Sequence, residues 1–183
     1  MADKRPAMGY SIAQEATRTG IGPDITSVSI HSEAIVGGGM DTQSILLAED
    51  HTILREGIKA MLSSCPDCAI VGEAEDGREA IQKAQELGPD VILMDLSMPN
   101  INGTEAIRTI KKRNPSIRII VLTMHRSREY VRATLEAGAD GYVLKDDTQQ
   151  DLMAAFASVR KGRVYLSSGI CDKVIDGYLN RQA

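Results

Sequence analysis

Between residues 44 and 162, short apolar runs alternate with longer stretches in which apolar residues recur at helical spacing. The apolar runs, rich in Ile, Val and Leu, predict strands at 45–49, 69–74, 91–95, 117–123 and 141–145. The amphipathic stretches that follow them predict helices at 53–63, 78–87, 103–113, 127–137 and 148–161. Five successive strand–helix units with apolar strands favour an α/β fold, in which helices cover both faces of a parallel sheet.

The two ends of the chain do not share this pattern. Residues 1–43 are interpreted as an N-terminal extension (a tag, fusion or non-native leader), with Met40 as the natural start; a regulatory arm is the alternative. Residues 44–162 form one predicted domain. Residues 163–183 are interpreted as a C-terminal extension that carries a further short element and a weak helix at 169–179.

Charge and hydropathy narrow the choice of function. With 21 Lys and Arg against 25 Asp and Glu, the net charge is −4, which argues against a dedicated nucleic-acid surface. No apolar stretch approaches the ~20 residues that span a bilayer, and the N-terminus lacks the apolar core of a signal peptide. We therefore expect a cytoplasmic protein without membrane contact. No glycine-rich nucleotide-binding motif follows a predicted strand, so nucleotide-dependent enzymes are not favoured.

Cys65 and Cys68 have the spacing of a redox or metal-binding motif, CPDC. A redox motif of this kind follows a strand and opens a helix, where the helix N-terminus lowers the thiol pKa. Here the motif follows a predicted helix and precedes a predicted strand. A zinc site would need two more ligands, and only Cys171 and three scattered histidines remain. The two residues are therefore predicted to be ordinary loop cysteines.

Polar side chains stand where the predicted strands end. Glu49 and Asp50 end the first strand, Asp95 the third, Thr123 the fourth and Lys145 the fifth. In an open parallel sheet, ligands bind beyond the carboxyl ends of the strands, so these side chains are expected to meet at one edge. Carboxylates brought together repel, and a hard divalent cation such as Mg²⁺ relieves this repulsion through oxygen ligands.

The same edge suits phosphoryl chemistry. Lysine offers a compact positive charge and threonine an O–H donor, and both groups can bind phosphoryl oxygens. The carboxylate of Asp95 can itself be the nucleophile that accepts a phosphoryl group. His51, beside Asp50, is a second candidate acceptor. Pro99 and Gly103 shape the turn that follows Asp95 and open the next helix.

Four motifs resemble the receiver domain of two-component response regulators: LLAEDH (46–51), VILMDLSMP (91–99), VLT (121–123) and GYVLKD (141–146). The resemblance covers about residues 44–162 and all five strand–helix units in order. It implies a flavodoxin-like (CheY-like) α/β fold, in which a five-stranded parallel sheet has the order 2-1-3-4-5 and helices on both faces.

The resemblance also implies roles for individual residues. Asp95 would be the phosphoacceptor rather than His51, because receivers accept the phosphoryl group on Asp. Asp50, Asp95 and the backbone carbonyl of Ser97 would bind Mg²⁺ (or Mn²⁺) directly, and Glu49 would bind it through water. Lys145 would pair with the phosphoryl group.

Further positions complete the implied switch. Thr123 and Tyr142 would form a pair in which the hydroxyl moves to the phosphoryl group and the aromatic ring rotates inward. Pro99 and Gly103 would hold the loop after the phosphoacceptor in place. His125 lies two residues after Thr123, at a position that varies in this family and tunes how long the phosphoryl group persists, as does the position of Ser97.

The motif GYVLKD and the stretch DLMAAFASVRKGRVYLS (151–167) resemble NarL/LuxR-type regulators, which continue through a linker into a helix-turn-helix domain. The chain is therefore interpreted as the receiver fragment of a transcription regulator, or alternatively as a stand-alone receiver. Residues 163–183 would begin the linker to a missing DNA-binding domain. The implied partners are a sensor histidine kinase and a second copy on phosphorylation, with DNA bound only through the output domain.

Two function classes follow from these residues. The first is a phosphorylation-activated signalling switch, which is no enzyme in the usual sense although it catalyses its own phosphorylation and dephosphorylation. The second is an unphosphorylated pseudo-receiver that acts as a protein–protein interaction module. The complete set of site residues (Glu49, Asp50, Asp95, Thr123 and Lys145) favours the first class.

Overall fold

A computed structural model of the chain describes residues 42–171. Of the predicted N-terminal extension, all but residues 42 and 43 lie outside the described residues, and so do residues 172–179 of the predicted weak helix. Residues 168–171, which include the first three positions of that predicted helix, are helical. Within residues 42–171, no helix has the length and apolar character needed to cross a membrane.

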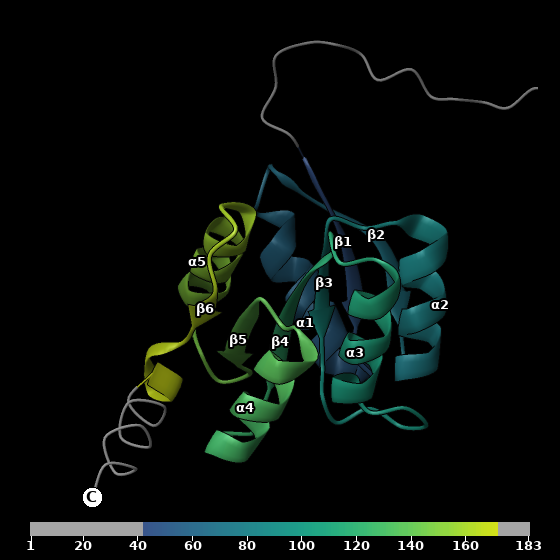
Figure 1. Ribbon diagram of the computed structural model, residues 1–183. Coiled ribbons are helices and arrows are strands. Elements are labelled where there is room, and N and C mark those ends of the chain that lie inside the picture. Colours follow the sequence, from purple (N-terminus) through teal and green to yellow (C-terminus); the bar gives the residue numbers. More distant parts are fainter. Residues whose placement is uncertain (1–41, 172–183) are drawn as a thin grey trace, which may run out of the picture. The chain divides into compact units, whose positions relative to one another are not determined.

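Five strand–helix units alternate along the described chain, as the hydrophobic pattern predicts (Figure 1). The strands are β1 (Gln43–Ala48), β2 (Cys68–Ala74), β3 (Val91–Met94), β4 (Arg118–Thr123), β5 (Gly141–Leu144) and β6 (Tyr165–Leu166). The helices are α1 (Thr52–Ser63), α2 (Gly77–Leu87), α3 (Gly103–Arg113), α4 (Arg128–Ala137) and α5 (Gln149–Arg160). All strand pairs are parallel.

The sheet has six strands in the order β2-β1-β3-β4-β5-β6, which corrects the predicted five-stranded sheet by one edge strand. The first five strands have the expected order 2-1-3-4-5. The additional strand β6 pairs Tyr165 with Gly141 and Leu166 with Tyr142. Because β6 has only two residues, it has no hydrophobic period that the sequence could display.

The core lies in two layers, one on each face of the sheet. Along β3, Ile92 and Met94 pack into the layer that contains buried residues of α2, α3 and α4. Val91 and Leu93 point to the opposite layer, which α1 and α5 complete. The arrangement of helices in Figure 1 agrees with this division. Alternating side chains therefore bury both faces, and only the strand ends remain for chemistry.

Helix ends follow local signals in the sequence. Asp76 and Asn102 cap α2 and α3 by accepting hydrogen bonds from backbone N–H groups. Thr148 and Asp151 form the capping box that opens α5, as their spacing indicates. Gly88 and Gly138 end α2 and α4 in the left-handed conformation, which glycine adopts most readily.

The prediction for the CPDC motif was wrong in one respect. The motif does lie in the turn between α1 and β2, but Cys65 and Cys68 are joined by a disulfide. Their Cα atoms are 5.4 Å apart in this turn, which is within the range that a disulfide spans. Element order argues against a redox-active site but not against a bond across a tight turn. Cys171 is the free cysteine.

Candidate functional site

The polar residues of the predicted site stand at the carboxyl ends of neighbouring strands. β1, β3, β4 and β5 are adjacent, so their ends lie side by side. β1, β3 and β5 each end one residue earlier than predicted, at Ala48, Met94 and Leu144. Glu49, Asp95 and Lys145 are therefore the first residues beyond their strands. The rigid strand fixes each backbone, while the side chain lies at the sheet edge.

Lys145 joins two buried carboxylates. Its Nζ lies 2.8 Å from Oε2 of Glu49 and 2.9 Å from Oδ2 of Asp95. The two acids are each 1% exposed, and the lysine side chain is 9% exposed. Burial by itself favours the neutral amine, but the hydrogen bonds to Glu49 and Asp95 outweigh it and raise the pKa of Lys145. The ammonium therefore stays charged and balances the acids around it.

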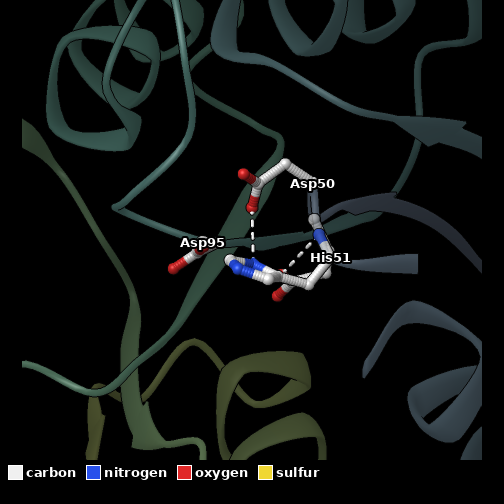
Figure 2. A group of neighbouring side chains, drawn as sticks. Asp50, His51 and Asp95 are labelled. Carbon is white, nitrogen blue, oxygen red and sulfur yellow. Dashed lines mark hydrogen bonds and ion pairs between the residues drawn. The ribbon is translucent and has the colours of Figure 1, made fainter. Parts of the chain in front are cut away.

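The acids cluster closely enough to hold a metal ion. Glu49, Asp50, His51 and Asp95 each offer one ligand atom, and these atoms lie within 4.8 Å of one another. Figure 2 shows Asp50, His51 and Asp95 converging from the ends of β1 and β3. Oδ1 of Asp95 is buried and accepts no hydrogen bond from any residue in the range 42–171. A buried oxygen without a partner, next to two further carboxylates, suits a hard divalent cation.

His51 belongs to this cluster although the sequence singled it out only as a rejected phosphoryl acceptor. Its Nδ1 lies 2.9 Å from Oδ1 of Asp50 and 3.2 Å from Oε1 of Glu49. Its backbone N–H also donates to Oε1 of Glu49 at 3.1 Å. The spacing of these three consecutive residues does not show which way the imidazole turns, because that depends on the side-chain rotamer at the start of α1.

Arg55 is a second residue that sequence reasoning missed. Although charged, it lies buried on α1, where Nη1 donates a 2.7 Å hydrogen bond to the carbonyl of Glu49. Its guanidinium also forms ion pairs with Glu73 at 3.1 Å and Glu75 at 2.8 Å. The sequence signal that could have identified Arg55 is the position of a charged residue on the apolar side of a predicted helix. It holds the backbone from which Glu49 and Asp50 project.

The loop after β3 depends on Gly103. A Cβ atom at this position would lie 2.2 Å from the carbonyl oxygen of Asp95 and 2.8 Å from Cα of Leu96. Only glycine lets α3 begin this close to Asp95. The N–H of Gly103 donates to the carbonyl of Leu96 at 3.1 Å and so closes the loop. Ser97 and Pro99 are exposed within it.

Thr123 and Tyr142 are both buried and both bond to the backbone of His125. Oγ1 of Thr123 accepts a 3.2 Å hydrogen bond from the N–H of His125, and the Tyr142 hydroxyl donates to its carbonyl at 2.9 Å. Burial raises the pKa of Tyr142 to about 12, with a smaller contribution from Tyr130. The phenol is therefore neutral and acts as a donor. The Tyr142 ring lies inward in this structure.

The His125 side chain connects the loop after β3 with α4. Its Nε2 lies 3.0 Å from Oγ of Ser97, and its ring stacks on Tyr130 with centroids 3.9 Å apart. The sequence marks His125 and Ser97 as positions of interest but gives no sign that they touch. Chain segments that are distant in sequence are thus linked beside Asp95.

Comparison with known proteins identifies the domain. The response regulator receiver domain family matches residues 45–157, which is more than half of the chain. The nitrate/nitrite response regulator protein NarL of Escherichia coli is 41% identical over 127 residues, covering 69% of this chain and 59% of that protein. The transcriptional regulatory protein DegU of Brevibacillus brevis is 37% identical over 134 residues, covering 73% and 57%. The chain thus spans less than two thirds of the length of these relatives.

Solved structures agree with the sequence matches. A LuxR-family two-component response regulator from Aurantimonas sp. has a TM-score of 0.73 at 34% identity, with 76% of this chain and 99% of that chain covered. The isolated receiver domain of RcsB from Salmonella enterica, determined with a phosphomimetic, has a TM-score of 0.69 at 32% identity and covers 73% and 99%. These relatives are NarL/LuxR-type regulators, and the chain belongs to the family of response regulator receiver domains.

Proposed function

We propose that this receiver domain is a phosphorylation-activated switch whose phosphoacceptor is Asp95. One observation carries the proposal: Asp95 is buried at the end of a central strand, with Lys145 at 2.9 Å on Oδ2 and with Oδ1 free of hydrogen bonds from residues 42–171. A nucleophile needs such a fixed position and a lone pair that is not engaged in a hydrogen bond. A carboxylate that served only the fold would have both oxygens paired.

The site fits Mg²⁺ (or Mn²⁺), because its donors are oxygens and one of them is buried without a partner. Asp50, Asp95 and the carbonyl of Ser97 would hold the ion, and Glu49 would act through water. When bound, the ion supplies positive charge that neutralises the phosphoryl oxygens. Arg55 keeps the backbone of Glu49 in place through its 2.7 Å hydrogen bond, so the first two acids stay oriented.

The phosphoryl donor is the phosphohistidine of a sensor histidine kinase. An oxygen of Asp95 forms a bond to phosphorus while the P–N bond to the donor imidazole breaks, and the imidazole keeps the electron pair. Lys145 already lies 2.9 Å from this carboxylate, so its charge is in position to bind a phosphoryl oxygen. Hydrolysis of the acyl phosphate in the same site would return Asp95 and inorganic phosphate, so the domain also limits its own signal.

Thr123 and Tyr142 would report the phosphorylated state. Both bond to the backbone of His125, so movement of the Thr123 hydroxyl toward the phosphoryl group would release the N–H of His125 and shift this segment. Tyr142 already points inward and already bonds to the His125 carbonyl, so it would keep this segment attached to β5 while Thr123 moves. Phosphorylation would then change the populations of two arrangements of β4, α4 and β5.

The domain would act within a NarL/LuxR-type transcription regulator. A receiver over 44–162 is consistent with the family match over 45–157, and residues 163–183 would lead toward a DNA-binding output domain. The partners would be a cytoplasmic sensor histidine kinase region and a second phosphorylated copy, and the domain would work in the cytoplasm. DNA contact would belong to the output domain, since the net charge of the chain is −4.

The alternative is a pseudo-receiver that binds partners without phosphorylation. The complete set of acids with Lys145 in contact argues for the switch, because an interaction module has no use for buried, mutually repelling carboxylates. Incubation with the small phosphodonor acetyl phosphate distinguishes the switch from the pseudo-receiver. In the presence of Mg²⁺, the intact mass of the wild type is expected to rise by one phosphoryl group. Chelation of the metal or the substitution Asp95→Ala should abolish the increase.

Two results would contradict the proposal. Equal labelling of Asp95→Ala and wild type would exclude Asp95 as the acceptor. An unlabelled wild type, with circular dichroism showing a folded protein and acetyl phosphate intact, would favour the pseudo-receiver.

A further inference from the structure

His51 turns its imidazole into the acidic cluster although it has the freedom to point to solvent. The residue precedes the first turn of α1, and its side chain is 68% exposed. It makes no side-chain capping bond to α1 in the described structure, so the helix does not impose its position. Instead Nδ1 faces Asp50 at 2.9 Å (Figure 2). It also lies 3.2 Å from Glu49.

These separations match two edges of a metal coordination shell. Ligand atoms ~2.1 Å from an ion and at right angles to each other are ~3 Å apart. The distances from Nδ1 of His51 to the oxygens of Asp50 and Glu49 have this length, and the ligand atom of Asp95 completes a group within 4.8 Å. An ion placed among the three acids would therefore have an imidazole nitrogen within reach.

A second observation points to a ligand at the same place. Asp95 is 1% exposed, and its Oδ1 is buried beside the cluster, with no hydrogen-bond donor among residues 42–171. The Nζ of Lys145 pairs with Oδ2 and leaves Oδ1 unpaired. This oxygen and the imidazole nitrogen face one group of acids, so the pocket offers a mixed set of oxygen and nitrogen donors.

We propose that His51 supplies an imidazole ligand to this pocket, so that the pocket also binds a borderline divalent transition ion, such as Co²⁺ or Ni²⁺. The inference rests on the proposed function, because it concerns the pocket assigned to Mg²⁺. Mg²⁺ prefers oxygen and gains little from an imidazole, whereas imidazole suits late first-row metals and strengthens their binding. His51 thus sets which ions compete for the site next to the phosphoacceptor.

The test compares two ions on the full 183-residue chain. Metal is removed with a chelator, and Co²⁺ and Mg²⁺ are titrated separately by isothermal calorimetry into the wild type and His51→Ala. The substitution should lower Co²⁺ affinity by about tenfold or more, as loss of a metal-orienting or ligating group commonly does. Mg²⁺ affinity should change less than about twofold, since this ion is bound by oxygens.

Two further variants locate the effect. Ile53→Ala is the matched control. Ile53 lies on α1, two residues after His51, and is 91% exposed, so its substitution should leave the affinities for Co²⁺ and Mg²⁺ unchanged. Asp50→Ala removes an acid of the cluster and should lower Co²⁺ and Mg²⁺ affinity together.

Three results would overturn the inference. Co²⁺ affinity that is unchanged in His51→Ala would mean that the imidazole only pairs with the acids. An equal fall in the affinities for Co²⁺ and Mg²⁺ in that variant would mean that His51 shapes the pocket without binding the ion. Co²⁺ affinity that persists in Asp50→Ala would place the ion elsewhere. Failure of the proposed function is read separately, from the absence of Mg²⁺-dependent labelling of wild-type Asp95 by acetyl phosphate.

Discussion

Lys145 connects two buried carboxylates that arrive from different strands, and this makes it the residue on which the pocket depends most. With Lys145→Met, Glu49 and Asp95 lose the ammonium that lies 2.8 and 2.9 Å away, and both remain buried. Removing one partner of a buried ion pair costs about 3–5 kcal/mol, because a charge is left uncompensated. We expect the free energy of unfolding in urea, measured without Mg²⁺, to fall by about 3 kcal/mol.

Lys59 supplies the matched control for this prediction. It pairs with Glu73 at 2.8 Å but lies at the surface, where ion pairs add little. Lys59→Met should therefore leave the unfolding free energy nearly unchanged. Equal effects of the two substitutions would show that the buried network contributes no more than a surface pair.

The raised pKa of Tyr142 predicts that the stability of the folded protein depends on pH in the alkaline range. Burial raises its pKa to about 12 from an ordinary 10, so the folded protein holds the phenol proton more tightly than the unfolded chain. The resulting stability is fully present below pH 10 and is lost as the pH rises toward 12. Burial also raises the pKa of Tyr165, so among residues 42–171 tyrosinate absorbance should show two late-titrating tyrosines, and Tyr142→Phe should remove one of them. A Tyr142→Phe curve whose late component is as large as that of the wild type would contradict the assignment.

At the level of residues, the sequence predicted the site through one argument. Residues that follow parallel strands share one edge of a sheet, so the strand ends alone indicated that Glu49, Asp95 and Lys145 would meet. The parts that it missed depend on side-chain rotamers on helices and loops. The inward turn of the His51 ring and the contact of His125 with Ser97 leave no mark in residue spacing.

Among the elements, the start of α3 is tightly constrained by the backbone of the loop after β3. The substitution Gly103→Ala would place Cβ 2.2 Å from the carbonyl oxygen of Asp95 and force the loop to move. Overpacking of this kind costs about 1–3 kcal/mol. We expect lower stability in urea and slower labelling by acetyl phosphate, because the displaced backbone carries the phosphoacceptor.

Gly57 in α1 is the matched control, since a Cβ there would meet no atom within 4 Å in the described structure. Gly57→Ala should stabilise the protein by about 0.5–1 kcal/mol, because alanine loses less backbone freedom in a helix than glycine. If Gly103→Ala proved as harmless as Gly57→Ala, the close approach of α3 to Asp95 would be of no consequence.

The connection between α1 and β2 gives a prediction about thiols. Cys65 and Cys68 form a disulfide and Cys171 is free, so alkylation of the unfolded, unreduced protein should label one cysteine per chain. Prior reduction should raise this to three, the number in the sequence. Intact mass spectrometry counts the labels. Three labels without reduction would show that the two thiols are unbonded.

At the level of elements, the hydrophobic period predicted each strand and helix of residues 42–171 that is longer than a few residues. Ile92 and Met94 alternate with Val91 and Leu93 between the two core layers, and this double burial is why β3 reads as a continuous apolar run. The sequence indicated a further short element after residue 162, but not that it would be a sixth strand of the sheet, because two residues carry no period. The disulfide escaped prediction because element order describes where the turn lies but not how close its ends come.

Across the whole molecule, the fold separates stability from chemistry. Two apolar layers bury both faces of the sheet, and the polar residues are concentrated where β1, β3, β4 and β5 end. We infer that a change in charge at this edge acts on α4, whose buried face belongs to one of these layers. The contacts of His125 with Ser97, Tyr130 and the Tyr142 hydroxyl provide a physical route from the phosphoacceptor loop to that helix.

The central claim is that Asp95 is the residue that becomes phosphorylated, and one measurement tests it directly. Borohydride reduces an aspartyl phosphate to homoserine, so the wild type is treated with acetyl phosphate and Mg²⁺, reduced, digested and mapped by mass spectrometry. We predict conversion at position 95 alone, and none when the metal is chelated. Conversion at Glu49 or Asp50, or a phosphoryl group found on His51 with residue 95 unchanged, would contradict the account.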